Sequence, residues 1–283
     1  MTRTKVNKMK LAAVVILYYP DESVFNNISS YIEEVDTVYI YDNSPTNTFE
    51  NQIHKLKNTR YYWDGKNEGI AKRLNSAFYM CLNEGYDHLL TMDQDSSFEN
   101  NDLTKYKFLI EELNIENISM YGILHDRKQI LANTKYYEMN KLLITSGSIL
   151  PIKSINDIGY FNEELFIDGV DTEYCLRIFE KYFKTIQFTS IVLNHNIGIS
   201  ATKITPSLKL EKRHFHSPIR AYYISRNYFY LRNKFKNQQH HLNSYIFFNE
   251  IKNGIMYGNE RLKYIFYALK GYIDFSRKKM GKI

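Results

Sequence analysis

The chain begins with short apolar runs that alternate with stretches of helical periodicity. Residues 11–18 form one continuous apolar run before Pro20, which predicts a strand buried on both faces. Residues 23–35 carry apolar side chains at helical spacing, and the same reading predicts strands at 37–41, 60–63 and 86–92 and a helix at 69–83. Strands and helices in this order predict a doubly wound α/β layer with its ligand crevice at the carboxyl ends of the strands.

The pattern beyond residue 100 is less regular. It predicts helices at 101–113 and within 168–182, and strands at 118–124, 142–150 and 185–193. Residues 196–218, with Gly198, Pro206 and Pro218, predict a mobile loop or lid. We therefore expect one large domain at 1–218 and a helical extension at 219–283.

Charge is distributed unevenly along the chain. From residue 203 onward there are 17 Lys and Arg against 4 Asp and Glu, whereas the first 202 residues hold 20 against 27. The basic, aromatic C-terminal part predicts either contact with an anionic membrane surface or a solvated helix on its own domain, and the acidic remainder argues against nucleic acid as a partner. No apolar run is long enough to span a bilayer, so we expect a cytoplasmic protein, peripheral on the inner face of the membrane if it contacts one. Cys81 and Cys175 lack partners at metal-ligand spacing, which predicts buried thiols in a reducing compartment.

Polar side chains follow three of the predicted strands. Asp42 and Asn43 come after the second strand, Asn67 after the third, and Asp93 and Asp95 after the fourth. Alternate residues of a strand share a face, so Asp93 and Asp95 are expected to point toward one divalent cation and its diphosphate. Acidic residues are common in turns, but their coincidence at one sheet edge predicts a binding site.

These residues fall within seven blocks that resemble the family-2 inverting glycosyltransferases of the GT-A fold. Within that family the chain looks most like bacterial rhamnosyltransferases that use dTDP-L-rhamnose. The resemblance implies a GT-A, Rossmann-like mixed sheet flanked by helices, followed here by a basic helical C-terminal extension. Residues 1–218 would then be the catalytic domain, with a nucleotide-binding half at about 10–98 and an acceptor half at about 99–218. The blocks, in order, are Val14–Tyr19, Asp42–Ser44, Asn67–Ala71, Asp93–Ser96, Thr145–Ser148, Phe166–Arg177 and His195–Gly198.

The resemblance implies a role for most of the polar strand ends. Asp42 would accept a hydrogen bond from a uracil or thymine base, while Asn67 and Gly69 would shape the nucleotide pocket. Asp95 and His195 would bind Mg²⁺ or Mn²⁺ together with the diphosphate. The remaining donor-binding residues that it implies are Tyr18, Arg73, Asp93 and Gly147.

Inverting transfer also requires a general base for the acceptor hydroxyl. The resemblance and its place at a helix N-terminus favour Asp171, with Asp168 as the rival and Asp168 or Glu173 tuning its basicity. Many family members have Glu-Asp here, whereas this chain has Val170-Asp171, so the tuning partner is open. An arginine beyond the catalytic domain, Arg226, would approach the diphosphate or the acceptor.

The expected function is transfer of L-rhamnose from a nucleotide donor to a lipid-linked saccharide acceptor in the synthesis of a bacterial surface polysaccharide. Two alternatives stay open. One is transfer of another sugar from UDP-galactofuranose, UDP-glucose or a UDP-N-acetylhexosamine. The other is a nucleotide-sugar-binding module without catalysis, which retention of Asp95, Asp171 and His195 disfavours.

Overall fold

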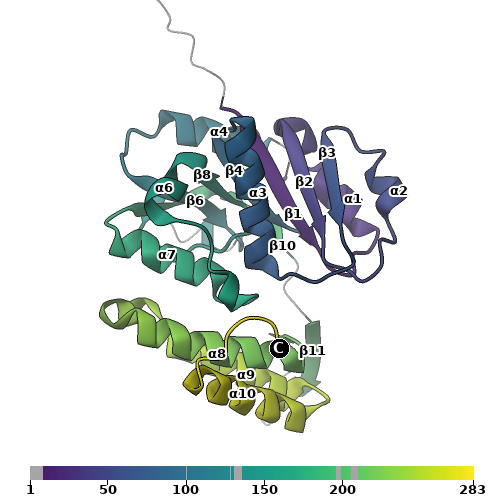
Figure 1. Ribbon diagram of the computed structural model, residues 1–283, viewed down its shortest axis with the longest axis vertical. Helices are drawn as coiled ribbons and strands as arrows, with labels where there is room; N and C mark the ends of the chain where they lie inside the picture. The colour runs from purple at the N-terminus through teal and green to yellow at the C-terminus, as the bar shows by residue number, and fades with distance from the viewer. Residues whose placement is uncertain (1–8, 100, 128, 131–135, 196–198, 205–209) are drawn as a thin grey trace, which may run out of the picture. The chain divides into compact units, whose positions relative to one another are not determined.

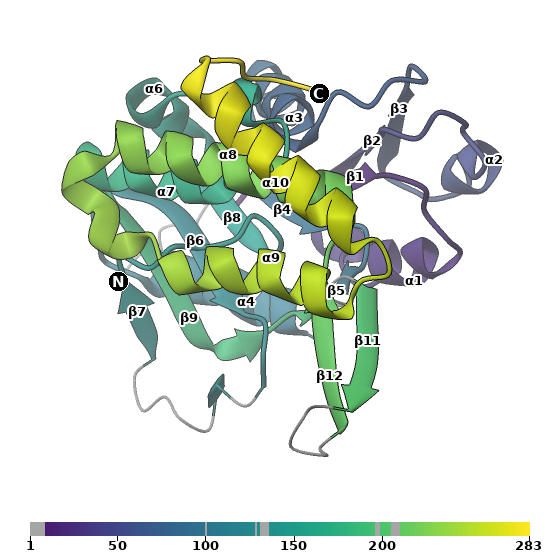
Figure 2. The ribbon, with the colours of Figure 1, turned by 90° about the horizontal axis from the view of Figure 1, so that it is seen from below.

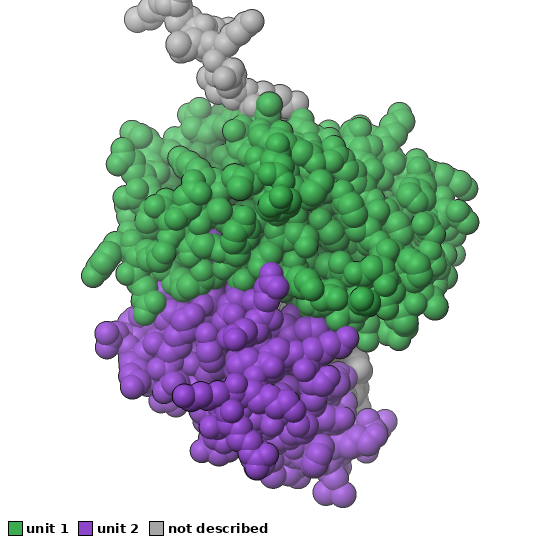
Figure 3. Space-filling model, in the orientation of Figure 1, with its two compact units in different colours: residues 1–161, 177–195 green, residues 162–176, 196–283 purple. Residues whose placement is uncertain are grey.

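The structure is a computed structural model in which the chain forms two compact units (Figure 3). Unit 1 comprises Met1–Phe161 and Arg177–His195, and unit 2 comprises Asn162–Leu176 and Asn196–Ile283. The domain boundary expected at residue 218 divides the chain differently and stays a prediction. The structure describes residues 9–99, 101–127, 129–130, 136–195, 199–204 and 210–283, apart from the side chains of His195, residues 199–204 and 210–215, Ile246 and Phe248.

Unit 1 is built on an eight-stranded mixed sheet in the order β3-β2-β1-β4-β8-β6-β9-β7 (Figure 1). Its first half is parallel and consists of β1 Leu11–Leu17, β2 Thr37–Asp42, β3 Thr59–Trp63 and β4 His88–Asp93. In the second half β8 runs antiparallel to β4 and β6, β9 is parallel to β6, and β7 is antiparallel to β9. These strands are β6 Ile118–Leu124, β7 Tyr137–Met139, β8 Ser148–Pro151 and β9 Lys184–Val192. The predicted mixed sheet is confirmed.

Strand β1 lies at the centre of the parallel half, as its apolar run predicts. Leu11, Val15 and the other odd-numbered residues pack against Val24 and Ile28 of helix α1 Ser23–Ser29. Side chains on a strand alternate between faces, and helix α3 Ile70–Glu84 covers the opposite face of β1. Helix α4 Asp102–Glu112 lies on the α1 face. Short elements complete the unit: α2 Glu50–Ile53, α6 Ile155–Ile158 and the 3₁₀ turns Ile32–Glu34 and Ile152–Ser154.

Unit 2 is mainly helical and contains the C-terminal part of the chain (Figure 2). Its elements are the 3₁₀ turn Glu163–Leu165, the first residues of α7 Val170–Glu180, β11 Ile199–Ile204, β12 Leu210–Phe215, α8 Pro218–Lys234, the 3₁₀ turn Lys236–His241, α9 Ser244–Tyr257 and α10 Arg261–Ser276. The loop expected over 196–218 is wrong in part, because β11 and β12 pair as an antiparallel hairpin. Residues 196–198 and 205–209 of that segment lie outside the described residues.

Two smaller expectations can be compared with these elements. Both Cys81 and Cys175 are fully buried free thiols, as expected. Among the helices that the structure describes, none is both long enough and apolar enough to cross a membrane.

Candidate functional site

Two aspartates flank the carboxyl end of β1 in unit 1. The register places Leu17 beside Asp42 of β2 and Ile16 beside Asp93 of β4. Both neighbours run parallel to β1, so their carboxyl ends meet at one edge of the sheet. The structure therefore brings together the strand ends on which the predicted donor site depends.

Asp93 and Asp95 are held in a tight turn and not along one strand. Strand β4 ends at Asp93, Gln94 and Asp95 form a turn, and the two-residue strand β5 begins at Ser96. The expectation that strand alternation puts the two carboxylates on one face is therefore wrong, although both lie at the end of the same strand. The Ser146 hydroxyl orders the turn, since it accepts the Asp93 N–H at 3.2 Å and donates to the Ser96 hydroxyl at 2.8 Å.

Gln94 joins this turn to the end of β1. Its side-chain amide pairs with the backbone of Tyr18, and its own carbonyl accepts a hydrogen bond from the Asn27 side chain at 2.8 Å. The sequence pattern indicates the flanking aspartates but not the role of Gln94. The position of Gln94 between two candidate metal ligands is the sequence feature that could have pointed to it.

The backbone of His195 is placed next to the same turn. Strand β10 Asn194–His195 pairs antiparallel with β5 Ser96–Ser97, with His195 opposite Ser96. Asp95 immediately precedes Ser96, so the backbones of His195 and Asp95 lie close together in space. The side chain of His195 lies outside the described part of the structure, and its role as a metal ligand stays a prediction.

The carboxylates of the turn have the chemistry that a hard divalent cation requires. Within the described part of the chain, no cluster of three or more His, Cys, Asp or Glu side chains is placed to hold a metal by itself. Mg²⁺ is commonly bound through one or two carboxylates, with substrate phosphates and water completing its shell. Asp93 and Asp95 fit that mode of binding, in which the nucleotide brings further ligands.

Asp42 is almost completely buried, with 1% of its surface exposed. One carboxylate oxygen accepts the Ser44 N–H and the other accepts the Tyr61 hydroxyl, both at 2.8 Å. Burial and, after it, the hydrogen bond to Asp42 raise the pKa of Tyr61, which keeps this hydroxyl a donor. Each carboxylate oxygen can accept more than one hydrogen bond, so these contacts fix the orientation of Asp42. Its recognition of a base stays a prediction.

Exposed aromatic rings lie at the same sheet edge. Tyr18, 49% exposed, follows β1, and its ring centroid is 4.6 Å from that of Tyr19 in an edge-on arrangement. Trp63 ends β3 and donates its indole N–H to the Ser44 carbonyl at 3.0 Å. Aromatic faces can stack on planar rings. Sequence reasoning found Tyr18 and missed Tyr19 and Trp63.

Arg73 of α3 is buried and holds the loop between β3 and α3. Its Nε donates to the Asn43 side chain at 2.8 Å, and its Nη2 donates to Asp64 at 2.7 Å and to the Lys66 carbonyl at 3.0 Å. The Asn43 side-chain oxygen also accepts the Glu68 N–H at 3.2 Å. Asn43, which the sequence predicts only as one of the polar residues at the sheet edge, therefore organises this loop together with Arg73. The donor contact expected of Arg73 stays a prediction.

Asn67 and the two predicted glycines have clear local roles. The Asn67 side chain accepts the Gly69 N–H at 3.0 Å, and Gly69 caps α3 with φ 80°. Gly147 has φ 75°, and its N–H donates to the Thr91 carbonyl at 2.8 Å. A Cβ on Gly147 would lie 3.0 Å from Leu193 and 3.1 Å from Ile123. Both glycines are thus required by the backbone, whether or not a nucleotide contacts them.

The acidic residues predicted for catalysis belong to unit 2. Asp168 has φ 62° and forms a two-pronged ion pair with Arg220, whose Nε donates to Oδ2 at 3.1 Å and whose Nη2 donates to Oδ1. Asp171 is the second residue of α7, and its Oδ1 accepts the Thr172 N–H at 2.7 Å. That these residues face the strand ends of unit 1 stays a prediction.

Glu173 and Arg226 are both buried in unit 2, and both are hydrogen-bonded to other residues of that unit. Glu173 is fully buried and accepts a hydrogen bond from Lys234 at 2.7 Å. Burial alone would lower the pKa of Lys234, but the hydrogen bond to Glu173 raises it. Arg226 is 0% exposed, and its guanidinium donates to the carbonyls of Glu164, Leu165 and Gly281. These contacts are structural, and they lend no support to diphosphate binding by Arg226 or to tuning of Asp171 by Glu173.

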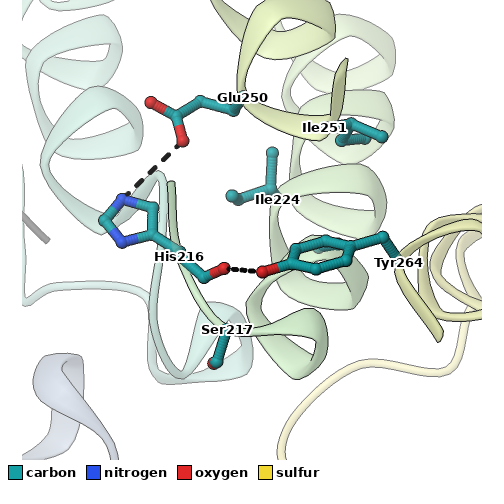
Figure 4. A pocket seen from close by; sticks show the side chains of 7 residues that line it. His216, Ser217, Ile224, Glu250, Ile251 and Tyr264 are labelled. Atoms are coloured by element: carbon teal, nitrogen blue, oxygen red, sulfur yellow. Dashed lines mark hydrogen bonds and ion pairs between the residues drawn. The ribbon is translucent and has the colours of Figure 1, made fainter. Parts of the chain in front are cut away.

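A small cavity in unit 2 is lined by side chains around His216 (Figure 4). Its volume of about 10 Å³ is near the space that one water molecule needs, so it cannot hold a nucleotide. Burial, followed by the nearby Arg220 charge, lowers the pKa of His216 to about 4. Arg220 donates to Nδ1 of this neutral ring at 3.0 Å, and Tyr264 donates to its backbone carbonyl. His216, which lines the cavity, thus helps to hold Arg220 in place, and Arg220 in turn holds Asp168.

Comparison with known proteins also points to glycosyltransferases. No family model matches the sequence. The chain is 27% identical over 239 residues to the dTDP-rhamnosyl transferase RfbF of Shigella flexneri, which covers 78% of this chain and 79% of that protein. It is similar in structure to S. aureus TarS 1-349, with a TM-score of 0.56, 16% identity and coverage of 94% of this chain and 81% of TarS.

A second similar structure is GalNAc-T7 with UDP, GalNAc and Mn²⁺, with a TM-score of 0.55, 10% identity and coverage of 67% of this chain. The chain has the GT-A glycosyltransferase fold. It spans only 44% of the GalNAc-T7 chain, so GalNAc-T7 carries a large part that has no counterpart here. The resemblance to GT-A glycosyltransferases expected from the sequence is confirmed, in sequence by RfbF and in fold by the two structures.

Proposed function

We propose that this chain is an inverting glycosyltransferase that moves L-rhamnose from dTDP-L-rhamnose to a saccharide acceptor in the synthesis of a bacterial capsule, O-antigen or exopolysaccharide. The observation that carries the proposal is the likeness to a dTDP-rhamnosyl transferase over 239 residues, in a chain whose sheet sets Asp42 and Asp93 on either side of the β1 end. The acceptor is proposed to be lipid-linked and to react on the cytoplasmic side of the membrane.

The donor is proposed to bind at the sheet edge of unit 1. Asp42, oriented by Ser44 and Tyr61, would accept the ring N–H of thymine. The exposed ring of Tyr18 offers a stacking surface beside it. Asp95, with Asp93 and His195, would hold Mg²⁺ or Mn²⁺, which supplies positive charge to neutralise the departing diphosphate.

Asp171 is proposed as the general base. It would take the proton of the acceptor hydroxyl as that oxygen attacks the anomeric carbon, while the bond to dTDP breaks on the opposite face of the sugar. The contacts of the rival support this assignment: both oxygens of Asp168 are engaged by Arg220, so protonating Asp168 would break an ion pair. Asp168 would then position the segment that leads into α7.

A donor screen tests the proposed function. The purified chain is incubated with Mg²⁺ or Mn²⁺ and each nucleotide sugar, and release of the nucleoside diphosphate is measured. We expect dTDP-L-rhamnose to react faster than UDP-galactofuranose, UDP-glucose and the UDP-N-acetylhexosamines. A clear preference for a UDP-sugar would contradict the donor assignment, and no release with any donor would favour a binding module.

The metal assignment is tested separately by Asp95→Ala in a binding assay. We expect this change to weaken donor binding in the presence of metal and to leave the weaker binding in EDTA unchanged, as measured by calorimetry with dTDP. Asp126→Ala is a matched control, since Asp126 is an exposed aspartate outside the predicted site. Equal metal dependence in Asp95→Ala and the unaltered chain would remove Asp95 from the metal site.

A further inference from the structure

Helix α10 is anchored to its own unit by one narrow face. Tyr264, Gly271 and Asp274 are its buried residues, and Gly271 lies so close to α8 that an added Cβ would be 2.3 Å from the Tyr222 carbonyl. The Asp274 carboxylate accepts hydrogen bonds from the Tyr222 hydroxyl at 3.0 Å and from Lys270 at 2.9 Å. Figure 2 shows α10 lying along α8 and beside α9. This contact fixes which side of the helix faces outward.

The outward side of α10 is apolar. Six large side chains are exposed at spacings of three, four and seven residues, which places them on one face of a helix. Leu262 is 82% exposed, Phe266 60% and Leu269 59%. Scattered apolar residues are normal on a surface, but a contiguous stripe marks a contact site. We call this stripe the α10 face, and its residues are Leu262, Ile265, Phe266, Leu269, Tyr272 and Ile273.

Positive charge borders the α10 face. Lys263, Lys270 and Arg277 follow one another at seven-residue intervals and lie along one border, and Arg261 lies on the other side. Residues 261–283 contain seven Lys and Arg and one acid, Asp274, which is buried and paired. Glu260, just before the helix, is paired with Lys263. An apolar stripe between cations is the pattern of helices that lie in the interface of a bilayer.

We infer that the α10 face is a docking surface for an anionic lipid bilayer, with the helix lying parallel to the membrane plane. The apolar side chains enter the boundary between head groups and acyl chains, and the basic border contacts the negatively charged head groups. Charge decides against a second copy of the chain as the occupant, because two such faces would bring their basic borders together. The inference rests on α10 alone and not on the proposed donor.

Point variants are the appropriate test, because the end of the chain is part of the fold. The Gly281 N–H donates to the Glu164 carbonyl at 2.8 Å, and the Ile283 N–H donates to the Tyr223 hydroxyl at 3.1 Å. Truncation before residue 283 would disturb these contacts together with lipid binding. Substitution on the outward side of α10 leaves them in place.

The experiment is co-sedimentation of the full chain with vesicles of phosphatidylcholine alone or of phosphatidylcholine mixed with phosphatidylglycerol. We expect binding to the mixed vesicles that falls as salt is added. The double variant Phe266→Ser with Leu269→Ser should reduce the partition coefficient at least about tenfold. Phe108→Ser is the matched control, since Phe108 of α4 is 58% exposed and lies in unit 1.

A second variant tests the charge without touching the apolar stripe. Lys278→Glu with Lys279→Glu, both exposed and beyond the end of α10, should lower binding to mixed vesicles and leave the circular dichroism spectrum unchanged. The inference would be overturned if the unaltered chain bound both kinds of vesicle equally. It would also be overturned if Phe266→Ser with Leu269→Ser bound the mixed vesicles as well as the unaltered chain does. A lipid-free dimer, seen by analytical ultracentrifugation, that Phe266→Ser with Leu269→Ser dissociates would overturn it as well. The assay contains no sugar, so its result is separate from that of the donor screen.

Discussion

The side-chain amide of Gln94 forms two hydrogen bonds with the backbone of Tyr18, accepting its N–H at 2.8 Å and donating to its carbonyl at 3.2 Å. The pair closes a link between the end of β1 and the turn that carries Asp93 and Asp95. Gln94 can thus set the distance between the proposed base pocket and the proposed cation.

Gln94→Leu is expected to loosen this link while keeping the volume of the side chain. Loss of two hydrogen bonds to partly exposed backbone should raise KM for the donor roughly tenfold, with a smaller change in kcat. Steady-state kinetics with the preferred donor measure both constants. Gln52→Leu, at an exposed position on α2, is the control and should change neither. An unaltered KM in Gln94→Leu would show that the turn holds its position without this contact.

Asp171→Asn should abolish most turnover and spare donor binding. Removal of a general base costs about a hundredfold or more in kcat, whereas the amide keeps the shape of the side chain. Asp168→Asn should instead weaken the ion pair with Arg220 and lower the melting temperature, with less effect on kcat. Asp157→Asn, at an exposed position on α6, is the control. If Asp168→Asn alone eliminated turnover, the base would be Asp168.

Acid should destabilise the fold through two partly buried histidines, His88 and His216. Burial lowers the pKa of His88 to about 4 from an ordinary value of 6.5, so its neutral form is favoured in the folded chain. The stability it contributes is complete above pH 6.5 and is lost as the pH falls toward 4, by about 3 kcal/mol in all. Urea unfolding at a series of pH values measures this.

His88→Phe should flatten that dependence, because the ring then takes up no proton on unfolding. His54→Phe is the control, since the His54 side chain is 59% exposed. His216, whose pKa is also about 4, should leave a residual dependence in His88→Phe. A pH profile identical in His88→Phe and the unaltered chain would refute the assignment to His88.

Gly271→Ala should separate α10 from α8. Its Cβ would meet backbone atoms, the Tyr222 carbonyl at 2.3 Å and the Arg226 nitrogen at 3.0 Å, which cannot rotate away. Overpacking of this kind costs about 1 to 3 kcal/mol, more than alanine gains from its higher helix propensity. Thermal unfolding measures the loss, and Ser276→Ala, at an exposed position on the same helix, should leave the melting temperature nearly unchanged.

Most of the elements were predictable because burial sets their apolar pattern, which is a continuous run in a strand buried on both faces and a helical spacing in a helix that covers the sheet. The run at 11–18 became β1, and 118–124 became β6. The helix expected over 23–35 is shorter, because α1 ends at Ser29 and a 3₁₀ turn follows. The hairpin of β11 and β12 was missed because Gly198, Pro206 and Pro218 outweighed the modest strand signal of residues 199–204 and 210–215.

The site was predictable only at the level of strand ends. Carboxylates such as Asp93 and Asp95 have a sequence signature, whereas the contacts of two neighbouring amides do not: Gln94 links their turn to β1, and Asn43 orders the loop before α3. Arg226 shows the same limit, because the sequence did not indicate that its guanidinium is buried against carbonyl oxygens. Its approach to the diphosphate or the acceptor stays a prediction. Which partners a polar side chain finds depends on contacts between residues far apart in the chain, and periodicity carries no information about them.

The last residues of the chain also set the order in which unit 2 can assemble. Arg226 and Glu164 both bind Gly281, so the segment leading to Asp168 and Asp171 lacks some of its native contacts until Gly281 has left the ribosome. Domains usually fold as they are synthesised. The acidic segment therefore completes its native contacts only after residue 281 has been synthesised, and a nascent chain stalled before Gly281 would carry the proposed base in an unfinished fold.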